Sequence, residues 1–264
     1  MMQGKEGESQ MKTRIRQQKI LEELHAKKIV YTKTLAEQFH VSSMTIRRDL
    51  ARLAEQKVIT LLTGGATLND GNTILPGTQE RSERMKELKA RIGAACAQIP
   101  KEGNSIYLDA GTTTQSIAMA LAERQNLVVM THSLAIMEIL SHAKGIQLLS
   151  VSGIYNEQVG GFLGDMTRRS IEEFHIDIGF LGACAIDTAT GEISCASVPD
   201  TDLKRAIIER SYRTVAVFDH TKLGTAFFRK VADLKDIDTL VTDGAADAKF
   251  LDRARRMGIE VITA

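Results

Sequence analysis

Apolar residues in the N-terminal quarter of the chain recur every three or four positions, which is the spacing of one buried helix face. Three such stretches predict helices over residues 11–26, 33–39 and 43–56. In the third stretch, Ile46 and Leu50 stand one turn apart and are expected to face a core. The short connection between the second and third stretches is typical of a helix-turn-helix unit.

Farther along, short apolar runs rich in β-branched residues alternate with helical patterns. The predicted strands cover residues 105–108, 127–130, 146–151, 178–183, 214–218, 239–242 and 260–263. The predicted helices cover residues 113–124, 134–141, 166–174, 202–212 and 246–257. Alternation of this kind predicts an α/β domain with a largely parallel sheet.

Loop-forming residues separate the two patterns. Residues 69–72 read Asn-Asp-Gly-Asn, and Pro76 and Gly77 follow, whereas a charged helical stretch begins at about residue 79 and runs to residue 98. We therefore divide the chain into a polar tail at residues 1–10, a helical domain at 11–66, a linker at 67–85 and an α/β domain at 86–264.

Composition narrows the class of protein. The 264 residues are 43% hydrophobic and 25% charged, as in ordinary globular proteins. No apolar run approaches the roughly 20 residues of a membrane span, and the polar start lacks a signal-peptide core. The three cysteines, Cys96, Cys184 and Cys195, form no Cys-x-x-Cys motif, which argues against a disulfide framework or a zinc site. We expect a cytoplasmic protein.

Charge is distributed unevenly along the chain. The net charge is +1, but residues 1–66 hold 12 Lys and Arg against 7 Asp and Glu, so the rest of the chain is slightly acidic. Arg14, Arg16 and Lys19 are expected on the surface of the first helix. A basic N-terminal domain favours a nucleic-acid partner. The alternative is that this charge belongs to a solvated surface only.

The outward face of the third predicted helix carries hydroxyl and guanidinium groups, at Ser43, Thr45, Arg47 and Arg48. Ser42, just before it, is a good N-cap. Arginine can donate two hydrogen bonds to a guanine, and a helix N-terminus attracts phosphate. These properties are those of a recognition helix in the major groove. The alternative is a capped surface helix with solvated arginines.

Two short β-type runs follow this helix, at residues 58–62 and 66–68, with the turn Thr63-Gly64-Gly65 between them. They predict a hairpin, or wing, and complete a winged helix-turn-helix arrangement. We expect Thr63 in the turn to contact DNA as well.

Polar residues directly follow four of the predicted strands, at residues 109–114, 131–133, 152–153 and 219–224. In a parallel sheet the carboxyl ends of the strands share one edge, and ligands bind in the crevice beyond that edge. We therefore expect these segments to surround one polar pocket.

The chemistry of this pocket suits a phosphorylated ligand. Gly111, followed by Thr112, Thr113 and Thr114 at a helix start, offers backbone N–H groups and hydroxyls to a phosphate. The carboxylate of Asp109 suits a sugar hydroxyl better than a phosphate.

Other residues are expected around the same pocket. Lys204 or Lys222 can neutralise the phosphate charge. The remaining residues that we expect to line the pocket are His132, Ser133, Gly153 and Asp219. The alternative is a plain helix cap with solvated threonines.

Residues 41–50 read Val-Ser-Ser-Met-Thr-Ile-Arg-Arg-Asp-Leu, and Gly-Gly-Ala follows at 64–66. The predicted α/β domain carries Asp-Ala-Gly-Thr-Thr-Thr at 109–114, Phe-Leu-Gly-Ala at 180–183, Lys-Arg at 204–205 and Asp-His-Thr-Lys-Leu-Gly at 219–224. From residue 11 to the C-terminus, the chain resembles the DeoR family of bacterial transcription repressors.

This resemblance implies a winged helix-turn-helix followed by an α/β effector domain similar in fold to ribose-5-phosphate isomerase and acyl-CoA transferase domains. It also implies a sequence-specific DNA-binding repressor of a sugar or polyol catabolic operon, controlled by a phosphorylated sugar or related anion.

The sequence departs from the family pattern at five positions. Leu61 and Thr63 stand in the wing where the family usually has Arg and His. Near the inferred pocket, His132, Ser152 and Asp200 replace the usual Asn, Gly and Glu. The effector is therefore expected to differ from the commonest sugar phosphates of the family.

Other chemistries find less support. Gly-Gly-Phe-Leu-Gly at residues 160–164 is not a dinucleotide-binding fingerprint, and neither His132 nor His220 has a second ligand at metal-binding spacing. We expect no cofactor, no metal and no catalytic residue. One alternative function is a sugar-phosphate enzyme with Asp109 and Asp219 as general bases. A second is a non-specific nucleoid-associated binder.

One recognition helix is expected to be too weak alone. Each bidentate base contact contributes about 1–3 kcal/mol of discrimination, whereas a specific operator requires roughly 4–10 kcal/mol over random DNA. We therefore expect a homodimer or homotetramer on paired half-sites, with residues 67–98 as the segment that transmits the effector signal.

Overall fold

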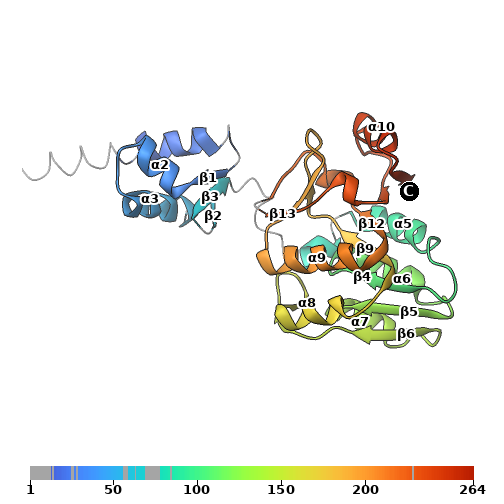
Figure 1. Ribbon diagram of the computed structural model, residues 1–264. Helices are drawn as coiled ribbons and strands as arrows, with labels where there is room; N and C mark the ends of the chain where they lie inside the picture. Colours follow the sequence, from blue (N-terminus) through green and yellow to red (C-terminus); the bar gives the residue numbers. More distant parts are fainter. Residues whose placement is uncertain are drawn as a thin grey trace, which may run out of the picture. The chain divides into compact units, whose positions relative to one another are not determined.

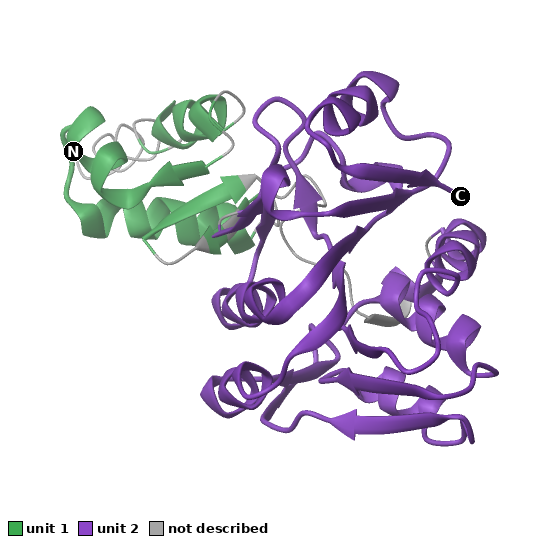
Figure 2. Cartoon of the chain, turned by 45° about the vertical axis from the view of Figure 1, so that its right-hand side comes forward, with its two compact units in different colours: residues 1–75 green, residues 76–264 purple. Residues whose placement is uncertain are grey.

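The computed structural model describes residues 13, 15–24, 27, 29–55, 59–62, 64–68, 78–83, 85–227 and 229–264. Residues 1–75 and 76–264 form two compact units, here named the head and the body (Figure 2). The predicted tail at residues 1–10, Arg14 and residues 69–77 of the predicted linker lie outside the described residues. No described helix is long and apolar enough to cross a membrane.

The head contains the predicted helices and wing. A first helix includes residues 15–24. The elements after it are β1 (Ile29–Tyr31), α2 (Thr32–Gln38), α3 (Ser43–Glu55), β2 (Ile59–Leu62) and β3 (Gly65–Leu68). The two wing strands β2 and β3 pair antiparallel, and β1 pairs with β3 on its other side. Strand β1 has only three residues, too few for an alternating pattern to reveal it in the sequence.

One apolar core holds the head together. Its fully buried members are Ile20, Leu24, Leu35, Ile46 and Leu50, which come from three helices. Strands β1 and β3 lie very close together beside this core. A Cβ atom on Gly65 would stand 2.1 Å from the carbonyl oxygen of Val30, so β3 can lie against β1 only because residue 65 is glycine.

The body is built on seven parallel strands in the order β15-β14-β12-β9-β4-β5-β6 (Figure 1). Their bounds are β4 Ser105–Leu108, β5 Leu127–Thr131, β6 Ile146–Ser150, β9 Ile176–Gly182, β12 Ser211–Val217, β14 Thr239–Thr242 and β15 Glu260–Thr263. All seven predicted strands are present and the sheet is parallel, so this part of the prediction is confirmed.

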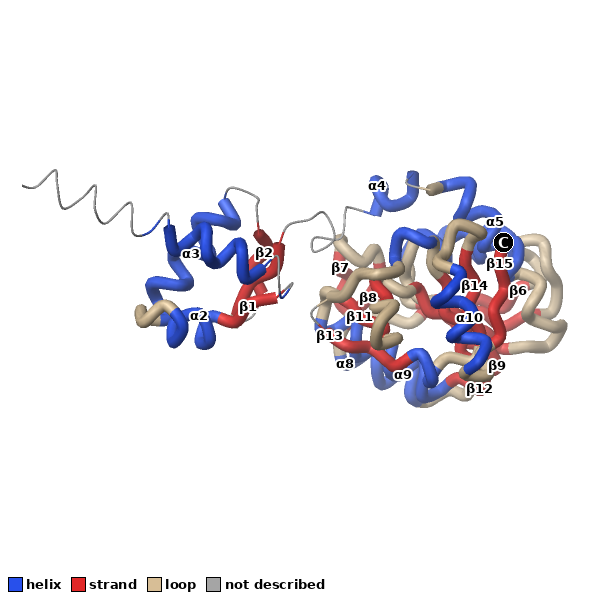
Figure 3. The backbone as a smooth tube through the Cα atoms, turned by 90° about the horizontal axis from the view of Figure 1, so that it is seen from above, coloured by secondary structure: helices blue, strands red, loops and turns tan. Residues whose placement is uncertain are grey.

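Helices cover both faces of this sheet (Figure 3). Helices α5 (Lys86–Cys96), α6 (Thr112–Leu121) and α7 (Leu134–Leu140) pack on one face. Helices α8 (Asp165–Glu172), α9 (Val198–Arg210) and α10 (Ala248–Arg256) pack on the other. The side chains of β4 alternate between the two layers, because successive residues of a strand point to opposite faces.

Two helix boundaries differ from the prediction. The expected helix over 79–98 is two helices, α4 (Thr78–Glu83) and α5, because Met85 between them has a left-handed φ of 57°. Helix α9 begins at Val198 rather than at residue 202. Pro199 stands in its first turn, where a missing backbone N–H removes no helical hydrogen bond.

Several short elements were not predicted. Strands β7 (Ile154–Asn156) and β8 (Gly161–Leu163) form a hairpin. Strands β10 (Ala185–Ile186), β11 (Glu192–Cys195) and β13 (Arg229–Asp233) form an antiparallel sheet that packs against α9. Runs of two to five residues are too short to show an alternating pattern.

Candidate functional site

The third helix of the head is capped as its sequence predicts. The hydroxyl oxygen of Ser42 accepts a hydrogen bond of 3.1 Å from the backbone N–H of Thr45. The two hydroxyl groups of these residues are 3.0 Å apart and share a second hydrogen bond. Ser42 therefore satisfies one of the free N–H groups at the start of α3.

Helix α3 separates an exposed face from a buried face. Ser43, Arg47 and Arg48 are exposed, and Thr45 is half-buried. On the buried face, Asp49 forms an ion pair with Arg16 of the first helix, with 2.5 Å between Nε and Oδ2. The expectation that Arg16 lies free on the surface is wrong, since it ties the first helix to the back of α3.

The wing holds Leu61 and Thr63, the first two positions at which the sequence differs from the DeoR-type pattern. Leu61 is half exposed on β2, so an apolar side chain stands where an arginine is usual. Thr63 lies outside the described residues.

The polar segments of the body gather at one edge of the sheet. Strands β4, β5 and β6 follow one another outward in one direction, and β9, β12, β14 and β15 follow in the other. The strand order therefore reverses between β4 and β9. Parallel sheets form a ligand-binding crevice at such a reversal, beyond the carboxyl ends of the strands.

Asp109 fills this reversal point and is fully buried. Its Oδ1 accepts a hydrogen bond of 2.9 Å from the backbone N–H of Ala110. Its Oδ2 accepts another of 2.9 Å from the backbone N–H of Gly182, at the end of β9. The ammonium group of Lys204 also bonds to Oδ2. The carboxylate thus joins the ends of the two central strands.

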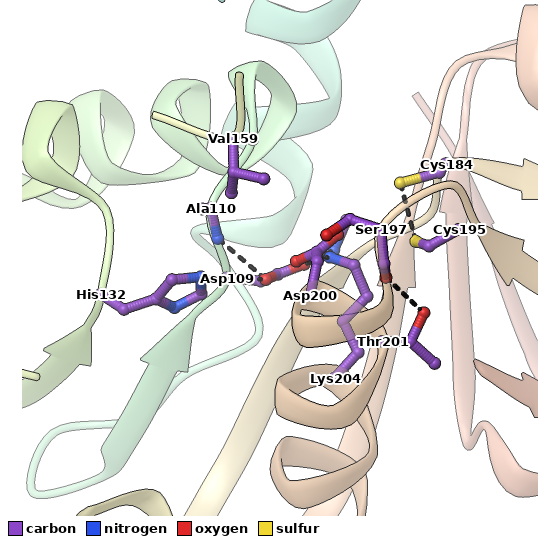
Figure 4. Close-up of polar contacts among 12 residues, drawn as sticks. Asp109, Ala110, His132, Val159, Cys184, Cys195, Ser197, Asp200, Thr201 and Lys204 are labelled. Carbon is purple, nitrogen blue, oxygen red and sulfur yellow. Dashed lines mark hydrogen bonds and ion pairs between the residues drawn. The ribbon is translucent and has the colours of Figure 1, made fainter. Parts of the chain in front are cut away.

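Lys204 is held between two carboxylates in the interior (Figure 4). Besides the bond to Asp109, its Nζ lies 3.6 Å from Oδ1 of Asp200, one turn earlier on α9. Burial alone would lower the pKa of Lys204, but the charges of Asp109 and Asp200 raise this pKa well above its usual value. The lysine is therefore charged at neutral pH. Burial raises the pKa of Asp200, and the charge of Lys204 opposes that shift.

His132 directly follows β5 and lies on the side of Asp109 opposite Lys204. Burial lowers the pKa of His132 to about 4, so the imidazole is neutral at pH 7. Its Nδ1 is 2.7 Å from the hydroxyl oxygen of Tyr107, and its Nε2 is 3.8 Å from Oδ1 of Asp109. A hydrogen on Nε2 would face this carboxylate favourably, which assigns the tyrosine O–H as the donor to Nδ1.

Three buried polar atoms in or near this cluster have no hydrogen-bond partner among the described residues. Neither Nε2 of His132 nor the hydroxyl oxygen of Ser133 has a hydrogen-bond partner among the residues that the structure describes. Oδ1 of Asp200 likewise accepts no hydrogen bond there. Buried polar atoms are normally paired, so the unpartnered atoms of His132, Ser133 and Asp200 indicate a place for a polar guest.

The glycine-threonine loop lies beside these atoms. Gly111 is half-buried, and Thr112 and Thr113 each keep 9% of their surface exposed. Thr114 points inward, and its hydroxyl donates to the carbonyl oxygens of Asp109 and Gly111 at 2.6 and 2.8 Å. Helix α6 starts at Thr112, which leaves the N–H groups of its first turn directed at the reversal point.

The other expected residues lie at the same edge but in different surroundings. A Cβ on Gly153 would stand 2.1 Å from the hydroxyl oxygen of Thr167, so this glycine packs tightly against α8. Asp219 is buried and its Oδ1 accepts a 3.0 Å hydrogen bond from the N–H of Thr221. Lys222 is half-buried, and its ammonium group makes no ion pair with any described residue.

The structure also groups residues that could ligate a metal ion. Ligand atoms of Asp109, His132 and Asp200 lie within 4.8 Å of one another. The charged ammonium group of Lys204 contacts both of these carboxylates, however, and a metal ion would face its repulsion. Within the described part of the chain, this cluster suits a hydroxylated guest better than a cation.

Comparison with known protein families decides what kind of chain this is. Residues 16–72 match the model of the DeoR-like helix-turn-helix domain, and residues 84–244 match that of the DeoR C-terminal sensor domain. The chain belongs to the DeoR family. The two matches also agree with the observed fold class, a helix-turn-helix domain followed by a parallel α/β domain.

Curated DeoR-type relatives match the chain over most of its length. The putative aga operon transcriptional repressor of Escherichia coli O157:H7 is 30% identical over 249 residues, which cover 94% of this chain and 92% of the relative. Transcriptional repressor AccR of Agrobacterium fabrum is 33% identical, covering 88% and 90%. The glycerol-3-phosphate regulon repressor of Escherichia coli K12 is 32% identical, covering 88% and 92%. This DeoR-family protein is a transcriptional regulator.

Solved structures are more distant. Ribose 5-phosphate isomerase A of Methanocaldococcus jannaschii is 17% identical with a TM-score of 0.40, and the match covers 53% of this chain and 55% of that one. eIF2B delta of Chaetomium thermophilum is 19% identical with a TM-score of 0.43, and the match covers 60% and 56%. The chain thus spans little more than half the length of either protein.

Three pairings in this DeoR-family site were not predicted from the sequence, although Lys204 itself was expected to line the pocket. Tyr107 bonds to His132 from the middle of β4, and nothing in the local pattern marks it. Asp200 and Lys204 did carry a signal, because residues four apart lie on one helix face. The contact between Cys184 and Cys195 carried none, because it depends on strand pairing.

Proposed function

We propose that this protein represses a sugar or polyol catabolic operon, that α3 reads the operator, and that a phosphorylated sugar or related anion binds at the reversal point of the sheet. The unpartnered polar atoms of His132 and Ser133 carry this proposal. They lie beside the first turn of α6, in a chain whose other unit is a helix-turn-helix domain.

The exposed face of α3 is the proposed reading surface. Arg47 and Arg48 extend from it and can reach base edges, and Ser43 and Thr45 lie nearer the helix start, where phosphates are attracted. Ser42 contributes through the cap that it forms. Thr63 is proposed as a wing contact from its place in the sequence alone.

The proposed effector site has two parts, one that binds the phosphate of the ligand and one that binds its sugar hydroxyls. The backbone N–H groups of Gly111, Thr112 and Thr113 bind the phosphate, and Lys222, which has no ion-pair partner among the described residues, adds a positive charge. The hydroxyl groups of the sugar bind Nε2–H of His132 and the hydroxyl of Ser133.

The remaining residues hold this site in shape. Asp109 and Lys204 join β4, β9 and α9, and Thr114 fixes the loop from inside. Gly153 and Asp219 position the neighbouring strand ends. The name of the glycerol-3-phosphate regulon repressor supports a small phosphorylated polyol as one candidate ligand.

Regulation rather than turnover is the proposed role of the body. Both oxygens of Asp109 accept hydrogen bonds, and Oδ2 is also ion-paired, so this carboxylate is poorly placed to remove a proton from a substrate.

We further propose a cytoplasmic homodimer or homotetramer on paired half-sites, since one reading helix provides too little discrimination.

The decisive experiment measures operator binding and its release with the full chain. DNA from upstream of the protein's own operon is footprinted, and bound DNA is then titrated with phosphorylated sugars, phosphorylated polyols and inorganic phosphate. A discrete protected site, released by one sugar or polyol phosphate but not by inorganic phosphate, is expected. Uniform protection would contradict an operator reader, and catalytic conversion of ribose 5-phosphate would favour an enzyme.

Lys222→Ala tests the effector half of the proposal separately. The variant should protect the same operator as the native protein but require more effector for release. An unchanged release curve would remove Lys222 from the site.

A further inference from the structure

Two cysteines meet beside the effector site, Cys184 directly before β10 and Cys195 at the end of β11. Ala185 of β10 pairs with Ser194 of β11, and one further step along this antiparallel register places Cys184 opposite Cys195. Their sulfur atoms are 2.8 Å apart, with the thiol of Cys195 donating to the sulfur of Cys184 (Figure 4). Neither cysteine has a role in the function proposed above.

The surroundings make one of the two thiols reactive. Cys184 is half-buried, whereas Cys195 is buried. The hydrogen bond from Cys195 lowers the pKa of Cys184, and the nearby charge of Lys204 lowers it further against the effect of burial. The third cysteine, Cys96, is buried elsewhere, and burial raises its pKa to about 12.

A metal ion is a poorer explanation of this pair. Cys184, Cys195 and Asp200 offer ligand atoms within 4.8 Å of one another. Two sulfurs bound to one tetrahedral zinc ion would stand about 3.8 Å apart, however, given zinc–sulfur bonds of about 2.3 Å. The observed 2.8 Å is much shorter, and the ammonium group of Lys204 lies beside the third ligand.

We propose that Cys184 and Cys195 form a reversible disulfide, and that this pair is a modification site for hydroperoxides at the rim of the effector site. The thiolate of Cys184 attacks the peroxide, the O–O bond breaks, and an alcohol or water leaves, which gives a sulfenic acid. The sulfur of Cys195 then attacks Cys184, the S–S bond forms, and water leaves. Two thiols are oxidised, and the peroxide takes up the two electrons.

The disulfide would act on the effector site through α9. Cys195 ends β11 shortly before α9 begins, and α9 carries Asp200 and Lys204. A covalent link to Cys184 fixes the start of this helix against the end of β9. This consequence rests on the proposed function. We expect oxidation to change the effector concentration needed for operator release by about fivefold or more.

The test uses the full chain, hydrogen peroxide and intact-mass measurement after alkylation of free thiols. The native protein should lose two hydrogen atoms and keep one of its three cysteines alkylatable, and dithiothreitol should reverse both changes. Cys96→Ser should still form the disulfide, whereas Cys184→Ser and Cys195→Ser should not. Addition of oxygen without loss of two thiols would overturn the proposal.

Two further readouts separate this proposal from its rivals. Retention of zinc by the native protein, lost in Cys184→Ser, would show a metal site instead. Operator release is then compared between reduced and oxidised protein. Because the mass readout needs no ligand, failure to form the disulfide refutes this inference alone. A disulfide in a protein that no sugar or polyol phosphate releases from DNA refutes the proposed function alone.

Discussion

The head and the body present their polar side chains in opposite ways. Arg47 and Arg48 on α3 extend into solvent, whereas Asp109, His132 and Lys204 in the body are at most 1% exposed. A polyanion as large as DNA can be met by charges that remain hydrated until contact. A small ligand provides few contacts, so its site must exclude water and hold polar atoms ready in the interior.

This difference has an energetic consequence. Exposed charges on α3 contribute little to folding, because solvent already satisfies them. The buried charges of the body depend on one another, since each would otherwise be unpaired in the interior. Substitutions in the head should therefore change binding with little effect on stability, and substitutions in the body should change both.

The largest expected effect is that of Lys204→Met. The variant leaves the carboxylates of Asp109 and Asp200 buried without their counter-charge, which should lower the free energy of unfolding of the body by about 3–5 kcal/mol. Thermal unfolding of the full chain measures this loss, with Lys222→Met, at the same edge but with no ion pair to a described residue, as the matched control. Equal melting temperatures for both variants would contradict the claim that the buried charges of the body depend on one another.

Next in size is the effect of Arg47→Ala on operator binding. Loss of one bidentate base contact should weaken binding by about 1–3 kcal/mol, which is roughly 5- to 150-fold, and relax sequence preference, without lowering the melting temperature. Anisotropy titrations at two salt concentrations measure it. Arg52→Ala, exposed at the far end of the same helix, serves as the control. If only the salt dependence changed, Arg47 would contact a phosphate rather than a base.

Lowering the pH should change the stability of the body by a smaller amount than Lys204→Met does. In the folded protein His132 has a pKa of about 4, below the usual 6.5. Between these two pH values the unfolded chain binds a proton on this histidine and the folded chain does not. Stability should therefore fall as the pH drops below about 6.5, by about 2 kcal/mol between pH 7 and pH 5. Urea unfolding of the native protein and of His132→Gln checks this, since the variant should lack that part of the dependence. Parallel curves for the two proteins would argue against a neutral buried histidine.

The smallest effect is expected for Ser42→Ala. Removing the cap of α3 should destabilise the head by about 1 kcal/mol, while Ser42→Asp should retain most of the stability because aspartate also caps helices. Circular dichroism during thermal unfolding of both variants measures the difference. A loss of DNA binding in Ser42→Asp with unchanged stability would instead indicate direct contact with phosphate.

Local patterns in the sequence were sufficient to predict most of the architecture. Apolar spacing identified α3 and its buried Ile46 and Leu50, and strand–helix alternation identified all seven parallel strands. Because the strands are parallel, the positions of Asp109 and His132 at one edge followed as well. These features depend on residues close together in the chain.

Contacts between distant residues were not predictable in this way. The bond from Tyr107 to His132, the ion pair of Arg16 with Asp49 and the approach of Cys184 to Cys195 each depend on which strands and helices become neighbours. The short strands that create the cysteine contact contain too few residues to show a pattern. The sequence therefore predicts where the site lies better than it predicts which side chains contact one another there.

The ion pair between Arg16 and Asp49 lies on the buried side of α3, away from the exposed arginines, so the residues that anchor this helix are not the ones that it presents to solvent. Ser43, Arg47 and Arg48 can therefore be substituted without disturbing how α3 is anchored to the rest of the head, which leaves the exposed face of this helix open to redesign.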